Sequence, residues 1–139
     1  MPASDIKRAG LKVTLPRLKV LEVLENAEPH HMSAEDVYKA LMDTGEDVGL
    51  ATVYRVLTQF ESAGLVIRHN FEGGRSVFEL DSGQHHDHLV CLSCGKVVEF
   101  VDETIERHQQ DIAKRNGFSI LDHSLVIYGH CAGCESAGV

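Results

Sequence analysis

The stretch that decides the fold is residues 50–63, LATVYRVLTQFESA. Its apolar side chains recur at i, i+3, i+4 and i+7, which predicts a helix with one face in a core. These apolar residues are Val53, Val56, Leu57 and Phe60. The positions left outside are Ala51, Arg55, Thr58 and Ser62, flanked by Thr52, Tyr54 and Gln59.

The outer face of this helix has the chemistry of a DNA-reading surface. It carries a cation, hydroxyls, an amide and an aromatic ring, groups that contact phosphates and base edges. Residues 50–60 contain no carboxylate, although the chain has a net charge of -8. An exposed helix face is usually only solvated, which is the alternative. The absence of carboxylates in so acidic a chain favours a helix that enters the major groove of DNA.

The segments around this helix predict a winged helix-turn-helix domain over residues 1–80. Before it, Thr14 and Pro16 are typical of a helix start, and that helix runs to about Asn26. Residues 33–36, SAED, form a capping box for a second helix that ends before Gly45. After residues 50–63 come two strand-like runs, 65–69 and 75–80. They flank Gly73-Gly74 and predict a hairpin.

A polar stretch at residues 81–84, DSGQ, predicts a hinge before a second domain over residues 85–139. Strands are expected at Asp87–Cys91, Lys96–Val101 and Phe118–His130, with a helix over Glu103–Asn116. The fold class is therefore α+β: a winged helix followed by a small α/β domain. A unit of about 60 residues buries little apolar surface, so we expect a structural metal or a partner subunit to stabilise it.

Length and composition narrow the class of protein further. A chain of 139 residues forms one domain or two small ones, and 43% apolar residues is typical of a folded protein. Even the longest apolar runs, such as residues 125–128, are too short to span a membrane. The first fifteen residues contain no apolar signal segment, so we expect a cytoplasmic protein whose thiols are reduced.

All four cysteines fall in two pairs of equal spacing, Cys91-x2-Cys94 and Cys131-x2-Cys134. Two such pairs are the usual way to build a closed tetrahedral site for structural Zn²⁺. A redox pair or inert buried thiols are the alternatives. A redox motif would need only one pair in a thioredoxin-like setting, which the sequence does not suggest.

A second candidate site is the run His85-His86-Asp87-His88. In an extended chain, His86 and His88 point to one face and His85 and Asp87 to the other, so the run predicts two separate metal sites. Glu79 also qualifies, because Phe78 and Leu80 on either side of it would face the hairpin core. Imidazole and carboxylate ligands suit several divalent ions. A solvated polar loop is the alternative.

Taken in order, four motifs resemble the ferric uptake regulator (Fur) family. They are residues 49–57 (GLATVYRVL), residues 85–89 (HHDHL), Cys91-x2-Cys94 and residues 128–131 (YGHC). The resemblance extends from about Gly10 to Cys134. It implies a homodimeric, metal-activated transcriptional repressor, not an enzyme, with an N-terminal winged helix and a C-terminal dimerisation domain.

The resemblance also implies roles for particular residues. The structural zinc ligands would be Cys91, Cys94, Cys131 and Cys134. The regulatory site would be His31, Glu79, His86, His88 and Glu99, and the second site His85, Asp87, Glu106 and His123. The DNA contacts would be Tyr54 and Arg55 in the major groove, Lys12 in the minor groove and Thr52 on a phosphate.

The ligand set favours Fe²⁺ as the regulatory ion, with Mn²⁺ or Zn²⁺ able to substitute. Peroxide-sensing relatives look to use Asp where this chain has Glu79 and Glu99, and zinc sensors look to use a Cys. The expected partner is an AT-rich double-stranded operator bound by a homodimer or a dimer of dimers. Zinc, manganese or peroxide sensing is the nearest alternative function. A small zinc hydrolase and a thiol redox switch are more distant ones.

Overall fold

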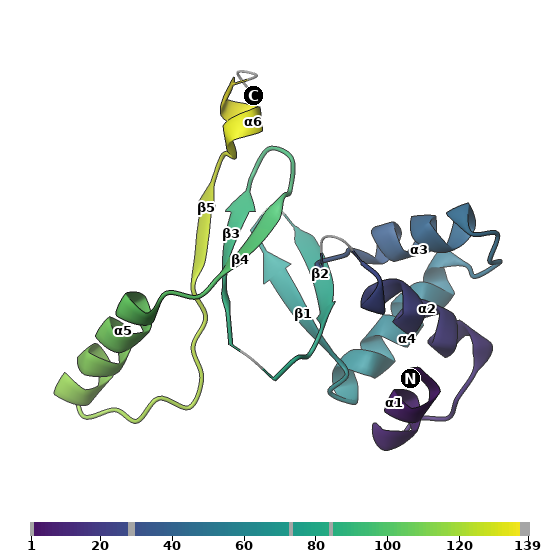
Figure 1. Cartoon of the computed structure of the whole chain (residues 1–139), viewed down its shortest axis with the longest axis horizontal. Helices are drawn as coiled ribbons and strands as arrows, with labels where there is room; N and C mark the ends of the chain where they lie inside the picture. The colour runs from purple at the N-terminus through teal and green to yellow at the C-terminus, as the bar shows by residue number, and fades with distance from the viewer. Residues whose placement is uncertain (1, 28–29, 73, 84, 137–139) are drawn as a thin grey trace. The chain divides into compact units, whose positions relative to one another are not determined.

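The computed structural model describes residues 2–27, 30–72, 74–83 and 85–136. The chain divides into two compact units, Met1–Gly83 and Gln84–Val139. The division falls within the segment 81–84 that the sequence predicts as a hinge. Figure 1 shows the packed helices and the hairpin of the first unit, and the separate sheet and helices of the second.

The first unit consists of helices followed by a two-stranded antiparallel sheet. The helices are α1 (Pro2–Arg8), α2 (Leu15–Glu25), α3 (Ala34–Asp43) and α4 (Leu50–Ser62), and the strands are β1 (Val66–Phe71) and β2 (Arg75–Leu80). Helices α2 to α4 and the hairpin make the predicted winged helix. In the described ranges, no helix is both long and apolar enough to cross a membrane.

Local sequence signals define the helix boundaries as predicted. The Thr14 hydroxyl accepts a hydrogen bond from the Arg17 N–H at 3.4 Å and caps α2. Ser33 and Asp36 form a reciprocal capping box at the start of α3. Gly64 follows α4 with φ +80°, a backbone conformation that favours glycine. Within the predicted Gly73-Gly74 turn, Gly74 has φ +78° and Gly73 lies outside the described residues.

The predicted core face of α4 is buried. Val53, Leu57 and Phe60 are fully inaccessible to solvent, and they join apolar residues of α2 and α3 in a single cluster. Phe78 of β2 belongs to the same cluster. The β1–β2 hairpin, which is the wing of the domain, is therefore packed onto the same core as α4. The face of α4 opposite its buried residues is left in solvent.

Helix α1 is not predicted by the sequence pattern. No element is predicted before Thr14, yet Pro2–Arg8 is helical and Ile6 is fully buried in the core. About two turns of helix with a single core residue have no periodicity to detect, so tertiary packing against α2 decides this helix.

The second unit is a three-stranded sheet with two helices. Its elements are β3 (Asp87–Cys91), β4 (Val97–Phe100), α5 (Glu103–Arg115), β5 (Val126–Gly129) and α6 (Ala132–Ser136). The strand order is β4-β3-β5, with β3 antiparallel to β4 and parallel to β5. The sequence did not predict α6.

The predicted strand Phe118–His130 is wrong over most of its length. Only Val126–Gly129 is a strand, because its ladder to β3 starts at His88 and ends at Cys91. Residues 118–124 have no place in that ladder, and Leu125 contributes only its carbonyl oxygen, which accepts from the His88 N–H at 3.1 Å. Residues 118–124 expose large apolar side chains instead: Phe118 is 73% exposed and Leu121 is 99% exposed.

The second unit buries very little apolar surface, as its size predicts. In its described part, the buried apolar side chains are those of Val90 and Cys91, and α5 buries none. An apolar groove is lined by Ile112, Phe118, Ile120 and Leu121. Such a unit needs further stabilisation, from a metal or from a second chain.

Candidate metal centres and DNA-binding face

The pairing of β3 with β5 brings the two cysteine pairs together. The strands are parallel, and Cys91 is in register with Gly129, so the turn at 91–94 lies beside residues 131–134. All four cysteines are free thiols, and their sulfurs lie within 4.8 Å of one another. The separation of Cys94 Sγ and Cys131 Sγ is 3.8 Å. A zinc tetrahedron with bonds of about 2.3 Å has edges of about 3.8 Å, so the four sulfurs fit Zn²⁺.

The acid–base properties of the cluster also favour a cation. The backbone N–H groups of Cys131 and Cys94 donate to Cys91 Sγ and lower the pKa of that thiol to about 5. Hydrogen bonds with the other cysteines, first with Cys131, raise the pKa of Cys134 to about 12. The backbone N–H of Cys134 lowers the pKa of Cys131 as well. The protein alone therefore favours ionisation of Cys91 and Cys131 and opposes ionisation of Cys134. A bound divalent cation would stabilise all four thiolates together.

A second cluster joins the start of β3 to α5 and to the segment before β5. His85 Nε2 lies 3.0 Å from Asp87 Oδ1 and 3.2 Å from Glu106 Oε1. The other Glu106 oxygen lies 3.1 Å from His123 Nε2. Asp87 is completely buried, and its Oδ2 atom has no hydrogen-bond partner in the described part of the chain. The four side chains offer two imidazoles and two carboxylates whose ligand atoms lie within 4.8 Å of one another, a donor set suited to a divalent ion.

A third set of ligands lies in the first unit, around Glu79. A pair of backbone hydrogen bonds between Met32 and Phe78 fixes the segment before α3 against β2. This places His31 beside the next residue of β2, with His31 Nε2 3.1 Å from Glu79 Oε2. Both side chains are almost inaccessible to solvent. Glu79 is thus turned away from the apolar core, as predicted, but it is buried all the same.

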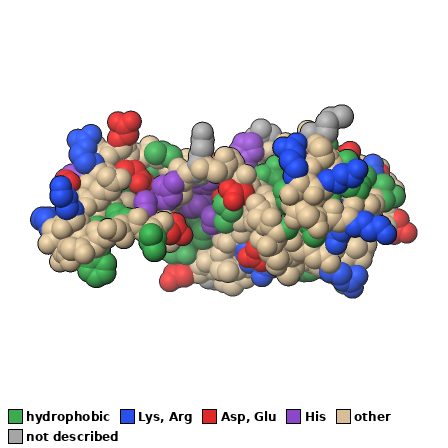
Figure 2. Space-filling model, turned by 90° about the horizontal axis from the view of Figure 1, so that it is seen from below, with side chains coloured by type: hydrophobic (Ala, Val, Ile, Leu, Met, Phe, Trp, Pro, Cys, Tyr) green, Lys and Arg blue, Asp and Glu red, His purple; other side chains and the backbone are tan. Residues whose placement is uncertain are grey.

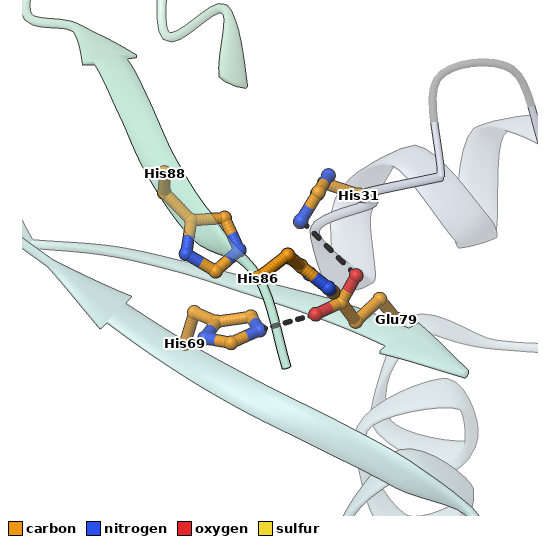
Figure 3. Close-up of side chains that lie close together, drawn as sticks. All are labelled: His31, His69, Glu79, His86 and His88. Carbon is orange, nitrogen blue, oxygen red and sulfur yellow. Dashed lines mark hydrogen bonds and ion pairs between the residues drawn. The ribbon is translucent and has the colours of Figure 1, made fainter. Parts of the chain in front are cut away.

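His69, which also contacts Glu79, was not predicted from the sequence. Figure 3 shows His31 and His69 at the two oxygens of Glu79, with His69 Nε2 2.6 Å from Oε1. In the hairpin, Ile67 is paired with Glu79, so His69 lies two residues along on the same face of the sheet. The register implied by a turn at 72–74 is the signal that could have revealed it.

The second unit contains a further set of candidate ligands, on the face of the sheet opposite Asp87. The rings of His86 and His88, also labelled in Figure 3, are 4.9 Å apart and meet edge to face. His88 is paired across the sheet with Glu99 of β4, and Glu99 Oε1 lies 3.5 Å from His86 Nε2. The run 85–88 therefore divides by parity. His85 and Asp87 face α5, and His86 and His88 lie with Glu99.

The outer face of α4 is exposed as its pattern predicts. Ala51, Tyr54, Arg55, Thr58 and Ser62 are exposed, and Thr52 and Gln59 are half-buried. Figure 2 shows Lys and Arg side chains on the first unit, at the right of the view, and others on the second unit, at the left. The outer face of α4 offers positive charge, hydroxyls and an aromatic ring without competing carboxylates on the first three turns of the helix.

Two contacts hold residues of this face in place. The Tyr54 hydroxyl donates to Glu35 Oε1 of α3 at 2.6 Å, which lowers the pKa of Glu35 and raises the pKa of Tyr54. Arg17 donates to the side-chain oxygen of Gln59 and to the backbone oxygen of Lys12, the latter at 2.6 Å. Arg17 thereby connects α4 to the loop that carries the exposed Lys12.

The fold and these clusters define the class of the protein: a winged-helix protein whose chain also carries sets of side chains that could hold a metal ion. The sequence profile of the Ferric uptake regulator family matches residues 8–128. The chain therefore belongs to the ferric uptake regulator family, a family of DNA-binding transcription regulators. It is not an enzyme, and the alternative of a zinc hydrolase is excluded.

Individual relatives resemble the chain along nearly its whole length. It is 66% identical over 133 residues to the ferric uptake regulation protein of Legionella pneumophila, covering 96% of this chain and 98% of the relative. The crystal structure of the Vibrio cholerae ferric uptake regulator has a TM-score of 0.88 and 60% identity, covering 93% and 98%. The structure of the Pseudomonas aeruginosa ferric uptake regulator with manganese has a TM-score of 0.80 and 59% identity, covering 95% and 98%.

Proposed function

We propose that the protein is a homodimeric repressor that binds AT-rich operator DNA when Fe²⁺ occupies its regulatory site, and so controls genes of iron uptake. The supporting observation is the position of Glu79. Its neighbour Phe78 packs in the same core as Phe60 of α4, so a metal ligand and the recognition helix belong to one packed body. The relative from L. pneumophila is named for ferric uptake regulation.

The regulatory ion would be held by His31, Glu79, His86, His88 and Glu99. The first two lie in the winged-helix unit and the other three in the second unit, and within each unit the side chains converge. An ion that needs both sets favours one arrangement of the two units. In a dimer, it thereby favours one spacing of the two recognition helices. If that spacing matches successive major-groove half-sites, metal tightens DNA binding and DNA tightens metal binding equally.

The choice of ion rests on the donor set. Two carboxylates and imidazoles without a thiolate suit Fe²⁺ and Mn²⁺, and supply in the cell then decides between them. The P. aeruginosa relative has been solved with manganese. We propose Fe²⁺ as the physiological ion, with Mn²⁺ or Zn²⁺ substituting in vitro.

The remaining ligand sets would hold ions of their own. The four cysteines would bind structural Zn²⁺, which joins the end of β3 to α6. His85, Asp87, Glu106 and His123 would hold a second divalent ion that fixes α5 against β3.

The exposed apolar groove beside α5 would pack against a second copy of the chain, and two dimers can bind one operator. The protein would act in the cytoplasm, where the operator is accessible.

The test of this function is DNA binding as a function of metal. Fluorescence anisotropy with an AT-rich inverted repeat, under anaerobic conditions and at one stated salt concentration, should show an affinity about 5- to 150-fold higher with Fe²⁺ or Mn²⁺ than without metal. A scrambled duplex of equal composition is the control. Equal affinity with and without metal would refute metal-dependent repression.

The recognition helix is tested through Arg55. Arg55→Ala should weaken operator binding by about 5- to 150-fold, because an arginine contact with a base or phosphate contributes about 1–3 kcal/mol. Metal content should be unchanged, since the side chain lies outside every ligand set. Arg107→Ala makes the same charge change on the exposed surface of α5 and should bind DNA like the wild type. An unchanged dissociation constant for Arg55→Ala would remove α4 from the interface.

A further inference from the structure

His69 contacts Glu79 but is not among the proposed ligands of the regulatory site. Its Nε2 atom lies 2.6 Å from Glu79 Oε1, within the first unit, and the contact is shorter than the 3.1 Å between His31 and Glu79. A carboxylate only accepts hydrogen bonds, so the His69 nitrogen carries the proton and donates it. Distances this short are typical of hydrogen bonds to ionised acceptors.

The ring of His69 is itself held in place. It stacks on Phe71, two residues along β1, with the ring planes 2° from parallel and the centroids 5.8 Å apart. The hairpin register fixes the strand beneath it. A donor with a fixed ring and a fixed backbone defines the direction of the Glu79 oxygen that it contacts.

The two imidazoles at Glu79 must behave differently when an ion arrives. A metal ligand offers its nitrogen lone pair to the ion, so His31 could not ligate through Nε2 while donating from that atom to Glu79. His69 could keep its bond, because Oε1 and Oε2 are separate acceptors. The buried carboxylate would then retain one donor while Oε2 turns to the ion.

We propose that His69 is a positioning residue of the regulatory metal site: it holds Oε1 of Glu79 and so presents Oε2, beside His31, to the ion. This inference rests on the proposed regulatory site and adds to it a residue that orients a ligand without being one. Residues that orient metal ligands typically change metal affinity by about 10- to 100-fold when replaced.

The test compares His69→Gln with His69→Phe in the full-length protein. Glutamine keeps an N–H donor at a similar distance from the backbone, and phenylalanine keeps the flat ring but has no donor. Mn²⁺ affinity is measured by competition with a fluorescent chelator, and the d–d absorption spectrum of Co²⁺ reports the ligand set. We expect about 10- to 100-fold weaker Mn²⁺ binding for His69→Phe, recovery of most of this loss in His69→Gln, and Co²⁺ band positions like those of the wild type in His69→Gln.

Two results would overturn the inference. Wild-type affinity in both variants would mean that His69 does not position Glu79. An equal loss in both, with shifted Co²⁺ bands, would make His69 a direct ligand. His108→Phe, at an exposed position of α5, is the matched control, and thermal melting of the metal-free variants verifies folding. His31→Ala separates failure of this inference from failure of the proposed regulatory site. If His31→Ala also leaves the Mn²⁺ affinity unchanged, the proposed ligand set of the regulatory site is wrong.

Discussion

A Cys91→Ser variant will lose its zinc, and its second unit will melt more than about 10 °C below that of the wild type. Cys91 is the buried member of the cluster, and two backbone N–H groups already stabilise its thiolate. Structural zinc contributes about 10–16 kcal/mol in small zinc domains, comparable to the whole stability of a typical domain. The few buried apolar side chains in the described part of this unit cannot compensate for such a loss.

The measurements are zinc content by mass spectrometry, melting by circular dichroism and molar mass by light scattering. The dimer should dissociate or aggregate together with the loss of zinc. Ser93→Ala is the matched control, because Ser93 lies between two of the cysteines but is not in the ligand cluster. A Cys91→Ser variant with one zinc per chain and wild-type melting would contradict a structural role. Ready disulfide formation in the wild type, with loss of DNA binding, would favour the thiol-switch alternative.

His88→Ala will abolish the effect of metal on DNA affinity while the dimer persists. The ratio of dissociation constants without and with Mn²⁺ should fall from about 5–150 to about 1, because the coupling requires the ion. His88 faces away from the Asp87 cluster, and the cysteine site does not include it, so folding and zinc content should be retained.

Matched histidines provide the controls for this second result. His108→Ala on α5 and His30→Ala, next to His31 but exposed, should keep the wild-type ratio. His86→Ala should behave like His88→Ala. A wild-type metal response in both His86→Ala and His88→Ala would contradict the proposed regulatory site, whatever the affinity of the metal-free protein for DNA.

Much of the fold was predictable because it depends on short-range patterns. Helix α4 follows from the spacing of its apolar residues, and α3 follows from its capping box. The parity of residues 85–88 separated His85 and Asp87 from His86 and His88 without knowledge of the fold, because alternate side chains of an extended chain point to opposite faces. Each of these features can be recognised from residues that lie within a few positions of one another in the chain.

The errors lie where distant segments decide the outcome. Helix α1 forms against a core that its own residues do not reveal. The strand before the second cysteine pair is limited to Val126–Gly129 by the length of β3, the strand it pairs with. His69 was missed because only the register of β1 on β2 places it at the oxygen of Glu79.

By itself, then, the sequence determined helices α2 to α5, the wing, the two cysteine pairs and the separation of the histidines into two sets. Only the tertiary structure decided which of those side chains lie close enough together to bind one metal ion. The reason is that periodicity and caps are properties of neighbouring residues, whereas ligand convergence depends on strand register and parallel pairing. Both bring together residues that are 10 to 48 positions apart, such as His69 with Glu79 and His31 with Glu79.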